Sequence, residues 1–339
     1  MAYTDIDKPS DYFNTKLYTG TGSTQSITGV GFQPDWVWIK DRDAANWNCL
    51  MDAVRGASKV IYSNESDAEA TVSTLLTSFD SDGFSLGAAA DGNRNTANFA
   101  SWNWKAGGSA SSNSNGSITS SVSVNQDAGF SIVSFTGNAT AGATIGHGLN
   151  SVPSLILTKN RDSAYNWHLW THAFSSYNDT IQLNTTAAKD TGTLLNNTAP
   201  TSSLITLGNS AVLNASGEKI IAYVFAEKQG YSKFGSYTGN GNADGTFVYT
   251  GFKPAFILAK DADSSDNWII HDTTRNPSNP VGAYLRPNLS SAEGTFSHYD
   301  ILSNGFKNLY AGGSLNGSGK NIIYMAFAEN PFVTSTGVP

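Results

Sequence analysis

The segment Pro34-Asp-Trp-Val-Trp-Ile-Lys40 is a short apolar run that begins at a proline and ends at a lysine. Two later segments repeat this pattern, Pro153-Ser-Leu-Ile-Leu-Thr-Lys159 and Pro254-Ala-Phe-Ile-Leu-Ala-Lys260. Their short length, their aromatic and β-branched content and the turn residues around them predict buried strands rather than helices. The chain of 339 residues therefore repeats one strand pattern three times.

Other landmarks surround these strands in a fixed order. An aromatic-Thr-Gly ends the preceding strand at residues 18–20, 135–137 and 237–239, and an apolar strand closes each copy at residues 99–104, 220–226 and 322–328. The lysines are 119 and 101 residues apart, and the tryptophans of an Asn-Trp pair are 120 and 101 residues apart. The repeated anchors, all predicted to be structural, are Lys40, Asn46, Trp47, Lys159, Asn166, Trp167, Lys260, Asn267 and Trp268.

A period of about 100 residues is too long for a solenoid unit, so each copy is predicted to be a domain of its own. Many short strands with regular turns predict an all-β protein of three tandem β-sandwich modules, jelly-roll or lectin-like, behind a short N-terminal arm. The predicted divisions are an arm at 1–11, modules at 12–108, 130–230 and 231–334, a Gly/Ser/Asn-rich linker at 109–129 and a tail at 335–339.

Local composition predicts how the modules are joined. The Gly/Ser/Asn run at residues 107–116 is typical of a flexible connection, so we expect the first module to move relative to the others. The second module passes almost directly into the third at residues 227–230, which predicts rigid docking. The apolar residues of 68–79 fall near a spacing of 3.6, which predicts one short helix there.

Composition excludes several classes of protein. Charged residues make up 14% of the chain and the net charge is −7, with 20 basic residues scattered along it, so the basic patch of a nucleic-acid-binding protein is missing. Cys49 is the only cysteine, which rules out an intramolecular disulfide and indicates a small buried side chain. No apolar run is long enough to span a membrane, and the first ten residues do not resemble a secretion signal.

Metal-binding patterns are present but incomplete. His168 and His172 lie four residues apart on an expected strand, without the glutamate of a metalloprotease motif. Asp-x-Asp pairs begin at Asp41, Asp80 and Asp261, and they predict turns, with calcium binding left open as the alternative. We predict no metal site and no cofactor.

Catalytic patterns are equally weak. The segment at residues 313–320 resembles a phosphate-binding loop, but its spacing fails and Asn321 replaces the required Ser or Thr, so a hairpin is predicted. Glu227 and Glu329 each end an apolar strand as Phe-Ala-Glu, and this recurrence favours an ion pair or a turn contact over a catalytic acid. We therefore predict no catalytic residue.

Tryptophan is the one residue type that indicates a ligand. Indole rings stack well on sugars, but an Asn-Trp pair present in all three copies is expected to be a core anchor. Trp102, Trp104 and Trp170 occur in single modules, and we therefore choose them as candidates for contact with a glycan.

Several segments together resemble a known family. These segments cover residues 12–20, 29–40, 230–240, 267–276, 302–307 and 326–332. They resemble a family of uncharacterised, repeat-bearing virion structural proteins of tailed bacteriophages, often marine, which are commonly labelled tail fibre or structural protein. The resemblance implies a particle component with lectin-like modules, and it brings no catalytic residue with it.

The resulting hypothesis is a non-enzymatic virion surface protein, made in the host cytoplasm and carried by the particle. It would be a tail fibre, a spike or a receptor-binding component that presents β-modules to the host surface. Two alternatives stay open, a capsid decoration protein and a glycan-degrading tail spike enzyme. The expected partners are other virion proteins contacted through the N-terminal arm, further copies of the chain (a trimer is the family expectation) and a host surface glycan, without nucleic acid or membrane insertion.

Overall fold

The computed structural model describes residues 4 and 6–331, and these residues form a nearly all-β protein. Six antiparallel sheets and three helices of one turn each are found in this part of the chain. The predicted tail at 335–339 lies outside the described residues. We refer to residues 12–108, 130–230 and 231–334 as the first, second and third repeat.

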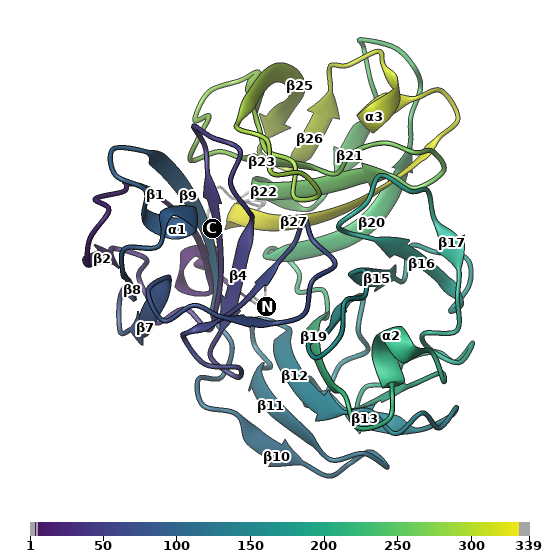
Figure 1. Ribbon diagram of the computed structural model, residues 1–339. Helices are drawn as coiled ribbons and strands as arrows, with labels where there is room; N and C mark the ends of the chain where they lie inside the picture. Colours follow the sequence, from purple (N-terminus) through teal and green to yellow (C-terminus); the bar gives the residue numbers. More distant parts are fainter. Residues whose placement is uncertain (1–3, 5, 332–339) are drawn as a thin grey trace.

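Each repeat contributes to one of three larger sheets (Figure 1). In sheet order, the first is β1 (Phe13–Thr19), β9 (Asn98–Trp104), β3 (Trp36–Asp41), β4 (Cys49–Asp52), β5 (Lys59–Tyr62) and β6 (Ala70–Thr71). The second is β10 (Ser111–Asn113), β11 (Ser120–Asn125), β12 (Phe130–Thr136), β19 (Lys219–Phe225), β14 (Leu155–Asn160), β15 (His168–Thr171), β16 (Asp179–Gln182) and β17 (Asp190–Thr191). The third is β20 (Ser232–Thr238), β27 (Asn321–Pro331), β22 (Phe252–Asp261) and β23 (Ile269–Asp272).

One strand order recurs in these sheets. It is β1-β9-β3-β4 in the first repeat, β12-β19-β14-β15 in the second and β20-β27-β22-β23 in the third. The three apolar runs that end in lysine are therefore strands, as predicted. The closing strands β9, β19 and β27 each lie between two neighbours, and their residues are buried on both faces.

Each repeat also carries a smaller sheet. These are β2 (Gln25–Thr28), β8 (Gly83–Leu86) and β7 (Leu76–Asp80); β13 (Thr144–Gly146) and β18 (Leu204–Thr206); and β21 (Phe247–Tyr249), β26 (Gly305–Asn308), β25 (Gly294–Leu302) and β24 (Val281–Tyr284). Because side chains alternate along a strand, β3 can serve two cores. Trp36 and Trp38 enter a core shared by all three repeats, whereas Val37 and Ile39 enter a core within the first repeat.

The shared core joins the repeats through interlocked aromatic rings. Trp36 of the first repeat stacks on Tyr223 of the second, with ring centroids 4.4 Å apart. Phe327 of the third repeat lies 5.1 Å from Phe13 and 5.8 Å from Phe225, centroid to centroid. Figure 1 accordingly shows three lobes around one centre. The expectation that the first repeat moves independently does not fit this packing, because such motion would break ring contacts on both sides.

The segment predicted as a linker, 109–129, carries two strands. β10 pairs with β11, and β11 pairs with β12, so this segment extends the sheet of the second repeat. Its Gly/Ser/Asn composition reflects an exposed edge with turns rather than a free tether. The described part of the predicted arm is also packed, since Ile6 is buried in the shared core and a short 3-10 helix, η1 (Pro9–Asp11), follows it.

The predicted helix at 68–79 is wrong. This segment holds β6 and β7, and the apolar residues of β7 pair across the sheet, Leu76 with Leu86 and Phe79 with Phe84. The helices lie instead just before each closing strand, at α1 (Ala90–Asn93), α2 (Ala211–Asn214) and α3 (Gly313–Asn316). α3 occupies the first half of the segment 313–320 that was predicted as a hairpin, and a turn at residues 318–319 follows it. No described helix is long and apolar enough to cross a membrane.

Candidate functional site

The three repeated lysines are buried and bonded to backbone carbonyls. The Nζ of Lys40 donates to Asn46 and to Ser290 of the third repeat, both at 2.8 Å, and that of Lys159 donates to Ser66 of the first repeat at 3.0 Å. Burial lowers the pKa of Lys40, Lys159 and Lys260 to about 8 each. Lys40 and Lys159 thus bond to a neighbouring repeat, whereas Lys260 bonds to the carbonyls of Asp261 and Ser264 in its own.

Two of the three repeated tryptophans hold neighbouring repeats together. Trp167 donates its Nε1–H to the carbonyl of Tyr62 in the first repeat at 2.8 Å. Trp268 likewise donates its Nε1–H to the carbonyl of Gln182 in the second repeat at 2.9 Å. Both indoles are buried, so each bond bridges two repeats inside the protein.

Trp47 does not take the equivalent place. Trp167 lies four residues before Thr171, and the residue four before the matching Asp52 is Asn48. Asn48 donates its Nδ2–H to Leu289 of the third repeat at 2.9 Å, while Trp47 is 43% exposed. The predicted equivalence of Asn46-Trp47 with the other two Asn-Trp pairs is therefore wrong by one position. The sequence already showed this shift, because the first two lysines are 119 residues apart whereas the first two tryptophans are 120 apart.

The tryptophans chosen as glycan contacts are inside the protein. Trp102 and Trp104 are fully buried and Trp170 is 3% exposed, so none can stack on an external sugar. They were chosen because they occur in single repeats, but that difference reflects how each repeat fills the shared core rather than a surface role.

The histidine and aspartate patterns have structural partners. His168 contacts the hydroxyl of Thr180 and His172 contacts the carbonyl of Phe234, so the two rings do not converge. Asp41 accepts two backbone N–H groups of the turn that follows it, which confirms its predicted turn role. Among the described residues, no group of three potential metal ligands is found.

Three buried asparagines were missed by the sequence reasoning. Asn93, Asn214 and Asn316 end the one-turn helices, and each accepts an N–H from the loop after the opening strand and donates to carbonyls nearby. Their spacing of 121 and 102 residues matches the repeat and could have identified them.

Each pair of repeats meets through an equivalent backbone hydrogen bond. The donor and acceptor pairs are Glu69 N and Arg161 O (2.8 Å), Lys189 N and Ala262 O (2.7 Å), and Glu293 N and Arg42 O (2.8 Å). We call these three contacts the 1/2, 2/3 and 3/1 boundaries. The repeats therefore form a closed ring in which each contacts both others.

The 1/2 boundary contains a buried network of charges. Arg55 is fully buried, pairs with Asp52 and lies 3.3 Å from Glu69. Arg161 of the second repeat donates two hydrogen bonds to Glu69, at 2.9 and 3.0 Å. Tyr223 donates its hydroxyl hydrogen to Asp52 at 2.7 Å. Burial disfavours the charged form of Glu69, but the hydrogen bond and charges of the two arginines outweigh it and lower its pKa.

The 3/1 boundary repeats this network with different residues. Arg275 pairs with Asp272 and lies 2.9 Å from Glu293, which Arg42 of the first repeat holds with bonds of 2.9 and 2.7 Å. Trp102 takes the place of Tyr223 and donates its Nε1–H to Asp272 at 3.0 Å.

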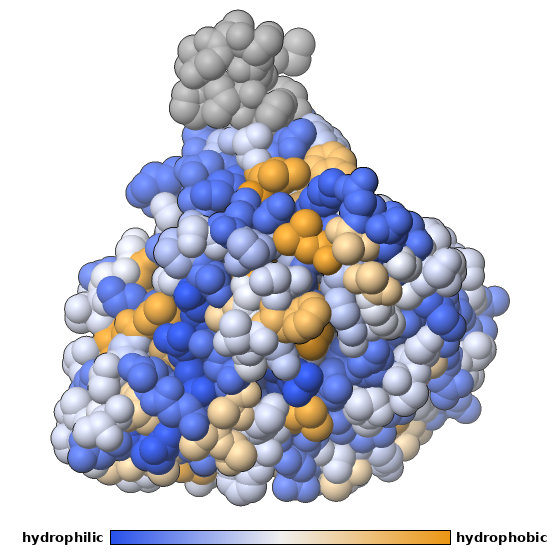
Figure 2. Space-filling model, turned by 90° about the horizontal axis from the view of Figure 1, so that it is seen from above, coloured by the Kyte–Doolittle hydropathy of each residue, from blue (hydrophilic) through white to orange (hydrophobic). Residues whose placement is uncertain are grey.

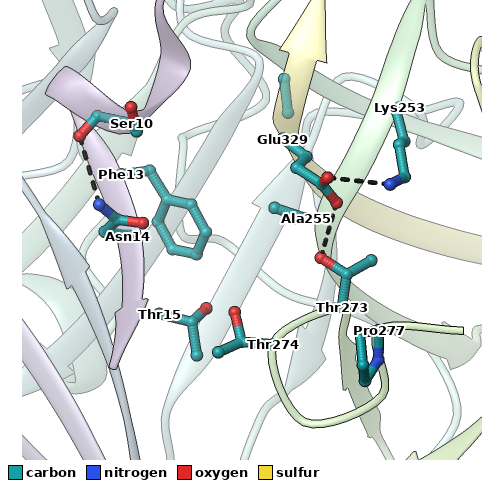
Figure 3. Close-up of a pocket in the computed structure, with 11 residues that line it drawn as sticks. Ser10, Phe13, Asn14, Thr15, Lys253, Ala255, Thr273, Thr274, Pro277 and Glu329 are labelled. Carbon is teal, nitrogen blue, oxygen red and sulfur yellow. Dashed lines mark hydrogen bonds and ion pairs between the residues drawn. The ribbon is translucent and has the colours of Figure 1, made fainter. Parts of the chain in front are cut away.

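A pocket of about 270 Å³ opens beside this second network, between β1 and the strands of the third repeat. It is lined by Ser10, Phe13, Asn14, Thr15, Lys253, Ala255, Thr273, Thr274, Pro277, Ala328 and Glu329. Figure 3 shows Phe13 and Asn14 facing Glu329 and Ala255 across the opening, with Thr15 and Thr274 together at one end.

Several polar groups of the pocket are already bonded within the protein, and Asn14 donates its Nδ2–H to the carbonyl of Val30 at 2.9 Å. Glu329 accepts bonds from Lys253 at 2.8 Å and from the hydroxyl of Thr273 at 2.9 Å, which confirms its predicted role in an ion pair. The hydroxyl of Thr15 is buried and has no hydrogen-bond partner among the residues that the structure describes. The exposed charged groups of the pocket are therefore the Glu329 carboxylate and the Lys253 ammonium.

Residues 8–331 match the family described as Domain of unknown function (DUF7483). The chain belongs to this family. No curated protein and no solved structure matches it. The family match covers every residue of the pocket and of both charge networks, so the site is part of the family's domain.

Proposed function

We propose that the chain is a non-enzymatic surface protein of a tailed-phage particle, a tail fibre, spike or receptor-binding component built from three β-sandwich modules. The observation that carries this proposal is the closed ring of three boundaries. Lys40, Lys159 and the two Arg–Glu–Arg networks bind one repeat to the next, and the buried asparagines fix loops within each repeat.

This use of polar residues favours a scaffold over an enzyme. A catalytic site needs an acid, base or nucleophile free to meet a substrate. Glu329, the one carboxylate in the pocket, is held by Lys253 and Thr273. The buried Cys49 has a raised pKa because burial disfavours the thiolate, which makes it unreactive.

The face of the molecule seen in Figure 2 is suited to several small contacts. Figure 2 shows one face on which apolar residues form small separate patches between polar ones. The exposed large apolar side chains of the described chain are Trp47, Val152, Tyr177, Phe247, Tyr249, Leu289 and Phe296. Weak apolar contacts of this kind are compatible with association between copies of the chain in a particle.

Locating the chain in a particle tests the proposal. Antibodies against the purified protein, labelled with gold, should mark the tail in electron micrographs, and mass spectrometry should count few copies per particle. Labelling spread over the head, with a copy number near that of the capsid protein, would favour the decoration alternative. Absence from purified particles would overturn the proposal, as would new reducing ends released from host surface glycan by the purified protein.

A further inference from the structure

Trp47 stands where the other two repeats have an asparagine. It lies seven residues after the repeated lysine of its own repeat, as Asn166 and Asn267 do in theirs. Asn184 donates its Nδ2–H to Asn166 at 2.9 Å, and Asn288 donates its Nδ2–H to Asn267 at 2.8 Å. In the second and third repeats, the asparagine at this position therefore holds a loop of its own repeat.

The first repeat does without this bond. Asn64 accepts the backbone N–H of Asn48 at 2.8 Å, as its counterparts do for the matching residues of the other repeats. Its own Nδ2–H donates to Glu65 at 2.7 Å, because an indole offers a donor but no acceptor. Trp47 is 43% exposed, whereas the other seven tryptophans of the chain are at most 3% exposed. The loop has thus lost an amide bond and gained an exposed aromatic ring.

A second exposed apolar residue lies beside Trp47, on the other side of the 3/1 boundary. Leu289 is 37% exposed, and its carbonyl accepts the Nδ2–H of Asn48 at 2.9 Å. Lys40 donates at 2.8 Å to two carbonyls, those of the residue before Trp47 and of the residue after Leu289. The two exposed side chains therefore belong to neighbouring segments of the surface.

The other two boundaries have polar side chains at both positions. The residue that follows the matched asparagine is Glu65 in the first repeat, Thr185 in the second and Leu289 in the third. The matching position across the boundary is Asn166 at the 1/2 boundary and Asn267 at the 2/3 boundary. Both positions are apolar at the 3/1 boundary alone, although the same backbone is built at all three. Packing of the fold therefore does not require the exposed pair.

Tyr62 holds the indole of Trp47 in place from one side. Their ring centroids are 4.7 Å apart, with 42° between the ring planes, and Tyr62 is buried. The exposed surface of the indole is thus on the side away from Tyr62. Asn64 and Glu65, both partly exposed, follow Tyr62 in the chain and bring an amide and a carboxylate close to this ring.

Size and chemistry define what could bind here. The exposed parts of two side chains are far smaller than the roughly 800 Å² that each partner contributes to a stable protein interface. A fixed, exposed indole with hydrogen-bonding groups nearby suits a ring that has C–H faces and hydroxyl groups at its rim.

We infer that the surface formed by Trp47 and Leu289 at the 3/1 boundary binds a sugar ring of a glycan, which stacks on the indole. Glu65 and Asn64 would bond to its hydroxyl groups. A single contact of this kind is weak, and several copies of the chain in one particle would add to it. This inference rests on the proposed function, because it names the receptor group that the particle protein would contact.

NMR of the full chain with isotope-labelled tryptophan tests the inference directly. Each of the eight tryptophans gives one indole N–H signal, and the signal that is missing in Trp47→Phe identifies Trp47. The probes are the methyl glycosides of glucose, galactose, mannose and N-acetylglucosamine. We expect at least one of them to shift the Trp47 signal saturably and to leave the seven buried indoles unchanged.

Saturation-transfer NMR with the same sugars compares variants. Trp47→Asn copies the other two repeats and should abolish binding, with an unfolding midpoint near that of the unaltered protein. Leu289→Thr copies the 2/3 boundary and should weaken binding about threefold, through the loss of a small apolar contact. Phe247→Asn removes an aromatic ring of similar exposure, 44%, elsewhere on the surface and should leave binding unchanged.

Several results would overturn the inference. These are a Trp47 signal that no sugar shifts, sugar binding that persists in folded Trp47→Asn, and tighter binding of choline than of any sugar. Self-association of the chain that Trp47→Asn abolishes, without any sugar binding, would assign the surface to a second copy instead. If Trp47→Asn does not fold, the indole signal and Leu289→Thr still decide. Gold labelling of particles does not depend on sugar binding, so failure of this site and failure of the particle assignment can be told apart.

Discussion

The 1/2 and 2/3 boundaries have the same backbone contact but different side-chain chemistry. At the 1/2 boundary, Arg55 and Glu69 are buried partners in an ionic network. At the 2/3 boundary, Phe174 and Lys189 stand in their places, and Lys189 pairs with Asp179 within its own repeat. The amide of the residue at the Glu69 position donates to the next repeat in both cases. The backbone bond is thus the constant part of the boundary, and the charges are a variable addition to it.

Removing one member of the ionic network should have the largest effect. Arg55→Met leaves Asp52 and Glu69 with less compensation in a buried site, and breaking a buried pair costs about 3–5 kcal/mol. Urea denaturation followed by tryptophan fluorescence measures the loss in the free energy of unfolding.

Replacing the whole network should cost much less than breaking it. The variant Asp52→Thr, Arg55→Phe, Glu69→Gln and Arg161→Ala brings the 1/2 boundary close to the composition of the 2/3 boundary. Because no charge is then left unpaired, we expect it to recover most of the stability lost by Arg55→Met. If the fourfold variant is as unstable as the single one, the charges are essential and the comparison of boundaries fails.

Acid should weaken the repeats that contain histidine. All five histidines lie in the second and third repeats. Burial lowers the pKa of His168 and of His298 to about 4 each, below the value near 6.5 expected in the unfolded chain. As the pH falls below 6.5, the unfolded state binds protons first, so the stability that these groups contribute is lost between pH 6.5 and 4.

The expected loss is about 2 kcal/mol for each of the two histidines by pH 4.5. His172 acts in the opposite direction, because its hydrogen bond with Glu227 raises its pKa, so its contribution is present below pH 6.5 and is lost as the pH rises through its folded-state pKa. Urea denaturation at pH 7, 5.5 and 4.5 measures the net change in the free energy of unfolding. The double variant His168→Gln, His298→Gln should show a shallower pH dependence, and an unchanged slope would contradict the assignment.

The strands that could be predicted from the sequence are those whose own residues form a short apolar run. The lysine-ended runs and the closing strands are apolar whatever surrounds them, so length and composition were enough. Segment 68–79 was wrongly predicted as a helix because its apolar residues have a helical spacing. In the structure Leu76 and Phe79 pair with residues of β8, and nothing within the segment itself indicates this pairing. The same holds for Trp102 and Trp104, whose burial depends on the other two repeats.

The candidate pocket could not be predicted for a related reason. Thr15 and Glu329 are more than 300 positions apart in the sequence and meet only because the ring of repeats closes. The hydrogen bonds at matching positions also differ between boundaries: Thr273 donates to Glu329, whereas His172, which follows the matching strand of the second repeat, bonds to the carbonyl of Phe234.

The smallest expected loss of stability comes from removing a single side-chain hydrogen bond between two repeats. Trp167→Phe removes the Nε1–H bond to Tyr62 at the 1/2 boundary, and Asn48→Ala removes the Nδ2–H bond to Leu289 at the 3/1 boundary. Each should lower the free energy of unfolding by about 1–2 kcal/mol, measured by urea denaturation. Trp47→Asn, at the exposed neighbour, should change it by less than about 0.5 kcal/mol. If Trp47→Asn were the more damaging change, Trp47 rather than Asn48 would be the true counterpart of Trp167, and the one-residue shift between the repeats would have to be withdrawn.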